Sequence, residues 1–284
     1  MSYSDLFLST SPLITISGEE KVQMFGVPFD STSSYRVGSR DGPNAFRQAY
    51  WNIEIYDQIL KVNAENVPVK DLGNMNLTVD SNYMLNAVAK VTGEIKQGGK
   101  VPAIIGGEHL LTLSSAAQFE GSSLLVFDAH LDYRDELYGL RISHGTFLRR
   151  LLEKVKFKKV VHAGSHAISE MEIRDGRKNM DIISSFDINQ SFDNYRMALK
   201  DMGDDIYVSI DLDVVDPAYA PGVGNPEPGG LTTMQILNLL YLLKDKKLVG
   251  FDIVELDPYF DTGITAPLAA KLFSILTIMA SGKR

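Results

Sequence analysis

The sequence predicts an α/β fold, a single domain built on a doubly wound, mostly parallel sheet of about eight strands. Short apolar runs alternate with longer amphipathic segments along the chain, which is typical of a parallel sheet with helices on both faces. The 284 residues are 44% hydrophobic and 23% charged, and no Pro/Gly/Ser-rich linker or repeat divides them. We therefore expect one domain over residues 1–284, with an N-terminal extension over 1–20.

The expected strands are eight near-continuous apolar segments, in chain order 21–27, 66–73, 101–107, 123–130, 158–164, 181–186, 205–211 and 248–256. Amphipathic, helix-like segments lie between most of them, for example 82–99 and 232–247. The segment 35–49 is expected to be a Gly-rich loop that leads into a helix. Its arginines are expected to be loop and packing groups or to form pairs between subunits, not to bind phosphate.

Composition excludes several classes of protein. The chain has no cysteine, which rules out disulfides, thiolate nucleophiles and Cys-ligated zinc. Its net charge of -8 is the opposite of what nucleic-acid binders usually carry. No apolar stretch reaches the ~20 residues of a membrane span, and residues 1–20 lack the pattern of a secretory signal. We expect a cytoplasmic protein without nucleic-acid or membrane partners.

Polar side chains follow four of the expected strands at the point where each strand ends. Ligands of such sheets bind outside the carboxyl ends of the strands, so these side chains are the candidates for a functional site. They come from "GGEHL", "DAHLD", "SIDLD" and "VELDP", and they are His109, Asp128, His130, Asp132, Asp211, Asp213 and Glu255.

Six of these candidates predict a metal site. Residues two apart in an extended chain point the same way, so "DAHLD" and "DLD" each direct several ligands at one place. Four carboxylates and two imidazoles are too many for one zinc, but they suit two divalent ions that share carboxylates. Oxygen and nitrogen ligands without sulfur favour Mn²⁺. With a bridging hydroxide the site would carry a charge of about -1, which favours a cationic substrate such as a guanidinium.

Each motif also has a structural interpretation. An aspartate after a strand is more often a helix N-cap or a turn former than a ligand. His144 is compatible with a helix start, and we expect structural roles for His162 and His166. The segment 220–230 either shapes a pocket wall or only connects two elements. The combination of motifs, each at a strand end, is what favours a site.

The same motifs resemble those of the ureohydrolase family, which comprises arginase, agmatinase and relatives. "VGSRDGPNAFR" and "PGVGNPEPGGLT" also resemble loops of that family, and the match runs from about 22 to about 280. The resemblance implies an arginase-type α/β fold, two Mn²⁺ per chain, hydrolysis of a guanidino group to urea, and homotrimers or homohexamers. It implies that His144 is the acid/base histidine, that Glu255 holds the guanidinium, and that the metal ligands are His109, Asp128, His130, Asp132, Asp211 and Asp213.

Two positions depart from the family pattern. Glu108 stands where the family usually has aspartate, and we expect it to lie behind the metal ligands. His166 stands where an arginine is expected, which affects contacts at the rim or between subunits and not the metal centre.

The implied reaction is attack of a metal-bridging hydroxide on the guanidinium carbon, after which Asp132 or His144 protonates the leaving amine. Arginases carry an asparagine at the position of Arg134, which we expect to pair with Asp135 or Glu136 or, alternatively, to bind a substrate carboxylate. The expected substrate is agmatine, giving putrescine and urea, or a close amine relative such as aminopropylagmatine. Guanidinobutyrate comes second and arginine third. The rival interpretations are a single-zinc deacetylase relative and a catalytically silent metal-binding protein.

Overall fold

The computed structural model describes residues 7–8 and 19–282 of the chain. Its centre is a nine-stranded sheet in the order β1-β5-β2-β6-β11-β10-β7-β8-β9. The strands are β1 (Phe7–Leu8), β2 (Val22–Val27), β5 (Val69–Met75), β6 (Val101–Gly106), β7 (Ser123–Phe127), β8 (Val160–Ser165), β9 (Asp181–Ser184), β10 (Asp205–Asp211) and β11 (Lys247–Val254). Only β1 is antiparallel to its neighbour, and the other eight strands run parallel. The predicted α/β fold with about eight parallel strands is confirmed.

The differences from the predicted strands are local. The segment 123–130 is strand only to Phe127, because the motif that follows is a loop. The short hairpin of β3 (Tyr56–Asp57) and β4 (Val62–Asn63) was not expected. Within the predicted extension 1–20, residues 7–8 pair with the edge strand β5, and most of the remainder lies outside the described residues.

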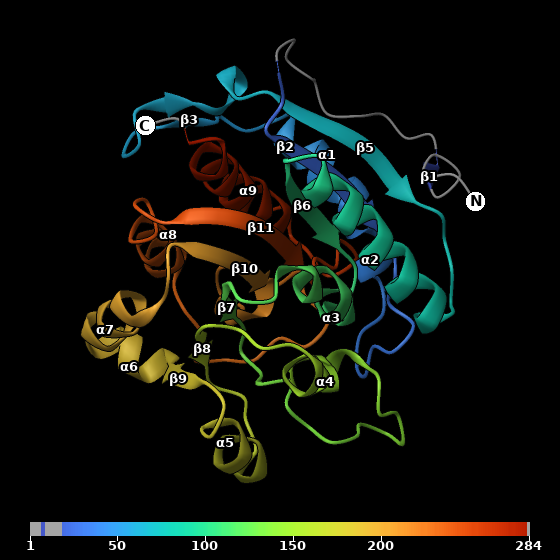
Figure 1. The fold of residues 1–284 in the computed structure, drawn as a ribbon, viewed down its shortest axis with the longest axis vertical. Coiled ribbons are helices and arrows are strands. Elements are labelled where there is room, and N and C mark those ends of the chain that lie inside the picture. The colour runs from blue at the N-terminus through green and yellow to red at the C-terminus, as the bar shows by residue number, and fades with distance from the viewer. Residues whose placement is uncertain (1–6, 9–18, 283–284) are drawn as a thin grey trace.

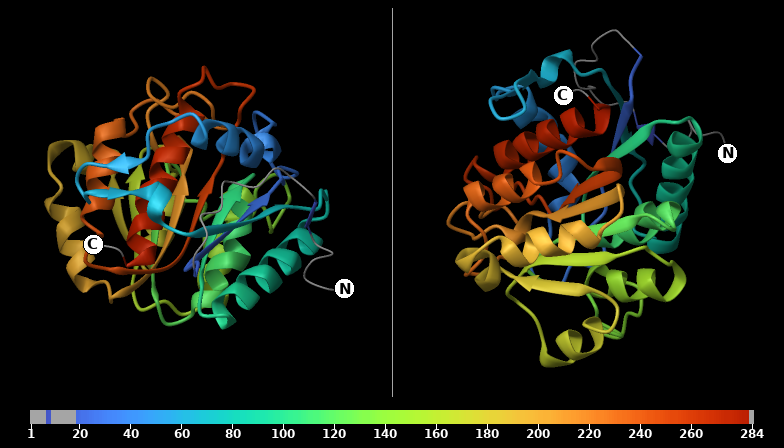
Figure 2. Two further views of the ribbon diagram at one scale, coloured as in Figure 1. Left: turned by 90° about the horizontal axis from the view of Figure 1, so that it is seen from above. Right: turned by 60° about the vertical axis from the view of Figure 1, so that its left-hand side comes forward.

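Helices cover both faces of the sheet (Figures 1 and 2). Their bounds are α1 (Gly42–Tyr50), α2 (Ser81–Gln97), α3 (Thr112–Ser115), α4 (Phe147–Lys154), α5 (Glu170–Gly176), α6 (Ser185–Gln190), α7 (Asp193–Asp201), α8 (Thr233–Tyr241) and α9 (Thr265–Ser281). One apolar cluster joins α1, α6, α7, α8 and α9 to the sheet, and a second joins α2, α3 and α4 to its other face. The fold is therefore doubly wound.

The central strands are apolar throughout because both of their faces are buried. In β7, Leu125 and Phe127 belong to the first cluster, whereas Leu124 and Val126 belong to the second. A strand covered on two sides has no polar face, so its sequence shows a continuous apolar run instead of an alternating one.

Helix ends follow from particular side chains. The carboxylate of Asp80 accepts from the backbone N–H groups of Asn82 and Tyr83 at the start of α2. Thr232 and Gln235 form a reciprocal capping box at the start of α8, and this pairing satisfies N–H groups that a helix start leaves free. Helix α9 ends at Gly282, whose φ of 68° is in the left-handed region that favours glycine.

The segment 35–49 is a loop that leads into α1, as predicted. Arg47 is buried there, and its Nε and Nη2 lie 2.8 Å from the two carboxylate oxygens of Asp71 in β5. Arg40 pairs with Asp30. Both arginines thus form ion pairs within the chain, and the expected alternative of pairs between subunits stays a prediction.

The strand order places four strands side by side at the middle of the sheet: β6, β11, β10 and β7. These are the strands that precede "GGEH", "VELDP", "DLD" and "DAHLD". Their carboxyl ends bring the four motifs to one edge of the sheet. Within residues 7–8 and 19–282, no helix combines the length and the apolarity that crossing a membrane requires.

Candidate metal centre and substrate cavity

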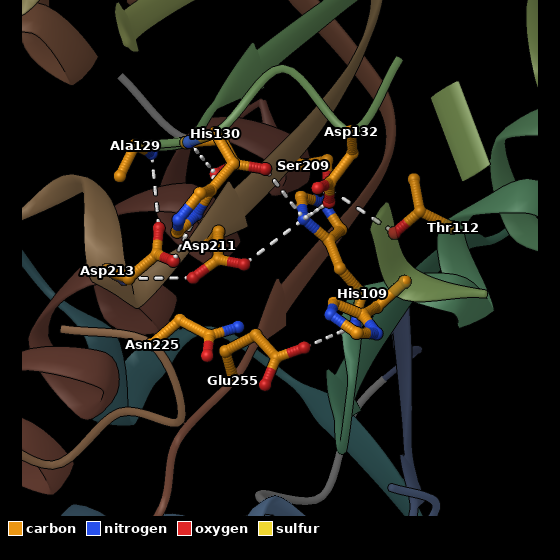
Figure 3. A network of polar contacts seen from close by, with 12 residues as sticks. His109, Thr112, Ala129, His130, Asp132, Ser209, Asp211, Asp213, Asn225 and Glu255 are labelled. Carbon is orange, nitrogen blue, oxygen red and sulfur yellow. Dashed lines mark hydrogen bonds and ion pairs between the residues drawn. The ribbon is translucent and has the colours of Figure 1, made fainter. Parts of the chain in front are cut away.

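The six predicted ligands form one connected cluster at this edge (Figure 3). His109 Nδ1 lies 3.0 Å from a carboxylate oxygen of Asp128, 3.6 Å from one of Asp132 and 3.1 Å from one of Asp211. On the other side of Asp128, His130 Nδ1 lies 3.6 Å from its second oxygen and 2.9 Å from Asp213. All are buried except His130, which is partly exposed.

The sequence analysis explained this convergence by an extended backbone, in which residues two apart point the same way, and that explanation is wrong. Residues 128–132 are not an extended strand, and Asp132 has a φ of 49°. Asp213 lies in a 3₁₀ turn over Leu212–Val214, which Asp211 caps by accepting from the backbone N–H of Asp213 at 2.8 Å. Turns directly after the strands bring these side chains together. The alternation of side chains in an extended strand does not apply to these turns.

Glycine at position 107 lets two strand ends approach closely. A Cβ there would lie 1.9 Å from the carbonyl oxygen of Phe29, which accepts a hydrogen bond from the backbone N–H of Glu108 at 2.7 Å. Any side chain larger than hydrogen would push the loop after β2 away from the start of the "EH" motif.

A buried series of hydrogen-bonded side chains orients His109. Ser209 Oγ lies 2.5 Å from Asp252 Oδ1 and 2.8 Å from His109 Nε2. Because the carboxylate can only accept, the serine proton goes to Asp252 and the imidazole donates from Nε2. His109 Nδ1 therefore faces the cluster and is the nitrogen that a metal ion would bind in place of a proton.

The sequence analysis missed Ser209 and Asp252. Tyr207 also donates to Asp252, at 2.7 Å. The sequence did contain a signal for Asp252, which is the one acidic residue in the apolar segment "LVGFDIV". A buried aspartate in such a strand must have polar partners.

Buried polar atoms at the cluster lack hydrogen-bond partners. Among the described residues, His109 Nδ1 and Asp128 Oδ2 complete no well-directed hydrogen bond, although they lie only 3.0 Å apart. Burial and neighbouring carboxylates raise the pKa values of Asp132 and Asp211 well above the usual range. Burial lowers the pKa of His109, but Asp128 and Asp132 outweigh it and raise this pKa to about 9. A cluster that attracts protons in this way also attracts cations, and it does so with free ligand atoms.

These atoms form two groups that could each hold a metal ion. One consists of His109, Asp128 and Asp132, and the other of Asp128, His130 and Asp213. Asp128 belongs to both groups, and Asp211 faces His109. A shared carboxylate between two ligand groups fits a pair of divalent ions better than one.

His144 lies beside the cluster at the start of a 3₁₀ turn. Burial, followed by the charge of His130, lowers the pKa of His144 to about 4, so this imidazole is neutral near pH 7. Ser34 Oγ lies 3.2 Å from Nε2 and Thr32 Oγ1 lies 3.3 Å from Nδ1. Ser34 and Thr32 are two further residues that the sequence analysis missed.

Glu255 reaches the cluster from the end of β11, with a φ of 65°. Its Oε1 accepts from the backbone N–H of His109 at 2.8 Å. Burial and the charge of Asp211 raise its pKa well above the usual range. Left-handed backbone at a residue other than glycine is costly and concentrates at functional sites, and both Asp132 and Glu255 have it.

A cavity of about 640 Å³ opens in front of the cluster. It is lined by six carboxylates, those of Asp132, Glu172, Asp211, Asp213, Glu227 and Glu255, and by one guanidinium, that of Arg134. The segment 220–230 supplies Asn225, Pro226 and Glu227 to the wall, so it shapes the cavity and is more than a connection.

The expected partner of Arg134 was wrong. Its Nε lies 3.7 Å from Glu172 at the start of α5, whereas Asp135 pairs with Arg141, Arg149 and Arg150. Glu172 is fixed because it also completes the capping box of α5 with Ser169.

The two remaining histidines lie next to this region. His166 Nδ1 faces the carbonyl oxygen of Gly164 at 2.8 Å and Nε2 faces that of Glu227 at 3.0 Å, so the residue ties β8 to the segment 220–230. His162 is fully buried, and burial lowers its pKa to about 4. His166 thus has the structural contacts that we expected, whereas neither ring nitrogen of His162 has a hydrogen-bond partner among the described residues, and its structural role stays a prediction.

Residues 20–279 match the model of the arginase family. Over 264 residues the chain is 32% identical to agmatinase from Pyrococcus horikoshii, covering 92% of each chain. It is 32% identical over 253 residues to N(1)-aminopropylagmatine ureohydrolase from Thermococcus kodakarensis, covering 88% of this chain and 87% of the relative. The crystal structure of agmatine ureohydrolase from Thermoplasma volcanium superposes with a TM-score of 0.89 at 35% identity, covering 96% of this chain and 95% of the other.

Proposed function

The chain belongs to the arginase family, and we propose that it hydrolyses agmatine to putrescine and urea at a centre of two Mn²⁺ ions. The family assignment makes it an agmatinase-like ureohydrolase. The finer assignment rests on one observation, the charge of the substrate cavity. Besides the proposed ligands, the described residues that line the cavity supply the carboxylates of Glu172, Glu227 and Glu255 but only one guanidinium.

In this proposal the metal ions are held by His109, Asp128, His130, Asp132, Asp211 and Asp213. The unpartnered atoms of His109 and Asp128 and the two ligand groups that share Asp128 support the assignment. When bound, two such ions lower the pKa of water and so supply a hydroxide near neutral pH.

The proposed tasks of the surrounding side chains are binding and proton transfer. Glu255 accepts hydrogen bonds from the guanidinium and fixes its orientation, since a carboxylate matches the N–H groups of that planar cation. His144, which is neutral near pH 7, takes up a proton and passes it to the leaving amine. Without that proton the amine is a poor leaving group.

The surroundings of Arg134 support the proposal of an amine substrate over an acid substrate. A guanidino acid would need a free cation for its carboxylate, and Glu172 lies 3.7 Å from the guanidinium of Arg134, the one arginine among the described residues that line the cavity. The ammonium of agmatine instead meets an excess of carboxylates. An unpaired buried charge is expensive, so we expect arginine and guanidinobutyrate to react more slowly than agmatine.

The test is urea release from agmatine, aminopropylagmatine, guanidinobutyrate and arginine by the Mn²⁺-loaded protein. We expect the highest kcat/KM with agmatine, and we expect Arg134→Gln to retain this preference. A higher kcat/KM with guanidinobutyrate or arginine would overturn the assignment of agmatine, and loss of a guanidino-acid activity in Arg134→Gln would identify the carboxylate receptor.

A further inference from the structure

Thr32 joins two residues that lie far apart in the sequence, Glu108 and His144. Its backbone N–H donates to Glu108 Oε2 at 2.7 Å, and its hydroxyl lies 2.5 Å from Glu108 Oε1. The same hydroxyl oxygen lies 3.0 Å from the backbone nitrogen of His144 and 3.3 Å from Nδ1 of its ring. Glu108 is fully buried, so Thr32 meets its carboxylate away from water.

Counting protons at the Thr32 hydroxyl gives the direction of each hydrogen bond. A hydroxyl has one proton and two lone pairs. The backbone N–H of His144 can only donate, so it occupies one lone pair. A carboxylate oxygen accepts, so the hydroxyl proton goes to Glu108. The second lone pair then faces His144 Nδ1, and a hydrogen bond forms there only if Nδ1 carries a hydrogen.

The geometry points to Glu108 and Thr32 as positioning residues that hold the His144 ring with its hydrogen on Nδ1 and its lone pair on Nε2. The inference rests on the proposed function in one respect, since it names Nε2 as the atom that takes up and returns the proton. Glu108 is not among the described residues that line the cavity, so in this inference it acts through Thr32.

The surroundings of Nε2 agree with this assignment. Ser34 Oγ lies 3.2 Å from Nε2, and Asn225 Nδ2 lies 3.5 Å from the same oxygen. Since an amide nitrogen only donates, Asn225 occupies a lone pair of Ser34 and leaves the serine proton for Nε2. Ser34, Asn225 and His144 all line the cavity, so the unprotonated nitrogen is the one next to other cavity-lining side chains.

The substitution Glu108→Gln should reverse the direction of these hydrogen bonds. The amide oxygen would accept from the backbone N–H of Thr32, and the NH₂ group would then face the hydroxyl. The hydroxyl would have to accept from that group, and its own proton would turn to His144 Nδ1. The ring hydrogen would move to Nε2, the wrong atom for taking up a proton.

The kinetic test compares Glu108→Gln, Thr32→Val and Thr32→Ser in the Mn²⁺-loaded protein. Thr32→Val keeps the shape but removes the hydroxyl, and Thr32→Ser keeps the hydroxyl. We expect Glu108→Gln and Thr32→Val to lower kcat by about 10- to 100-fold with unchanged KM and metal content, because general acid–base catalysis is typically worth ~10²–10⁴-fold. Thr32→Ser should restore most of kcat. The matched control is Thr92→Val in α2, which removes a buried hydroxyl that has no hydrogen-bond partner in the part of the chain that the structure describes and should leave kcat unchanged.

Two further results would separate a positioning role from a structural one. If Glu108 acts through Thr32, the double variant Glu108→Gln/Thr32→Val should be no slower than Thr32→Val alone. The chain has five histidines, so ¹⁵N spectra of histidine-labelled protein loaded with diamagnetic Mg²⁺ can report the ring hydrogen of His144. We expect it on Nδ1 in the wild type and on Nε2 in Glu108→Gln.

The inference and the proposed function fail in different ways. Wild-type protein that releases urea while Glu108→Gln and Thr32→Val match its kcat overturns the inference alone. A ring hydrogen on Nε2 in the wild type, as a protonated Glu108 would give, also overturns it. Wild-type protein that releases no urea from any guanidino compound overturns the proposed function, and the NMR result then still tests the assignment of the ring hydrogen.

Discussion

At the scale of single residues, the centre depends on which nitrogen of each histidine is free. Ser209 and Asp252 orient the His109 ring with Nδ1 toward the carboxylates, and Thr32 contacts Nδ1 of His144. Each arrangement follows from a donor that can only donate or a carboxylate that can only accept. The two histidines thus present different nitrogens. His109 presents Nδ1, which suits a metal ion, and His144 presents Nε2, which suits a proton.

His162 gives a prediction about stability at acid pH. Burial lowers its pKa to about 4, against about 6.5 for an exposed histidine. Between these two values the unfolded chain binds a proton that the folded protein excludes, so the free energy of unfolding falls as pH drops from about 6.5 to about 4. Replacing His162 with leucine should remove roughly 1–2 kcal/mol of the loss between pH 7 and pH 5.

Urea denaturation of metal-saturated wild type and His162→Leu at both pH values measures this difference. Acid loss of metal affects both proteins, so only the difference between them counts. Equal falls in the two proteins would mean that His162 titrates normally in the folded state.

At the scale of elements, the site stands on short turns attached to rigid strands. The four motif-bearing strands β6, β11, β10 and β7 are neighbours in the sheet, and the "DAHLD" loop and the 3₁₀ turn Leu212–Val214 begin directly at strand ends. The ion pair between Arg47 of α1 and Asp71 of β5 is fully buried beside this sheet. Removing one partner of such a pair leaves a buried charge without compensation.

We predict that Arg47→Met lowers the free energy of unfolding by about 3–5 kcal/mol. The double variant Arg47→Met/Asp71→Asn should be more stable than Arg47→Met, because the uncompensated charge is gone while the amide oxygen still accepts from Gly73, as Asp71 does. The exposed pair of Arg196 and Asp193 is the control, and Arg196→Ala should cost less than about 1 kcal/mol. Urea unfolding curves measure all three variants. A double variant as unstable as Arg47→Met would show that packing, and not charge, dominates at this position.

At the scale of the whole molecule, one edge of the sheet concentrates negative charge that the rest of the fold does not neutralise. Burial and mutual repulsion raise the pKa values of Asp132, Asp211 and Glu255. In the proposed function two bound cations balance this charge, which makes metal binding part of the stability of the folded chain. The trimeric or hexameric assembly implied by the family resemblance stays a prediction.

We predict close to two Mn²⁺ per chain and a lower Tm after chelation. Asp128→Asn should weaken the binding of both ions, because Asp128 belongs to both ligand groups. Asp213→Asn should still bind close to one ion per chain. Elemental analysis measures the Mn²⁺ content per chain, and thermal unfolding before and after chelation measures the change in Tm. One metal per wild-type chain, or a Tm that chelation does not change, would contradict the two-ion proposal.

The sequence by itself determined the fold class, the parallel strands and the identity of the candidate site. Apolar strands that are covered on both faces have a recognisable pattern, and polar residues at the ends of parallel strands must lie at one edge. The apolar strand pattern and the polar residues at strand ends are both visible in short stretches of sequence. His109, Asp128, Asp213 and Glu255 could therefore be identified as candidate site residues without a structure.

The tertiary structure alone decided how these residues are held. Asp132 and Glu255 have left-handed backbone, Arg134 pairs with Glu172 instead of its sequence neighbours, and Thr32 bonds to Glu108 across 76 positions. A hydrogen bond between distant segments leaves no periodic pattern in the sequence, because its energy depends on where the folded sheet brings the two groups.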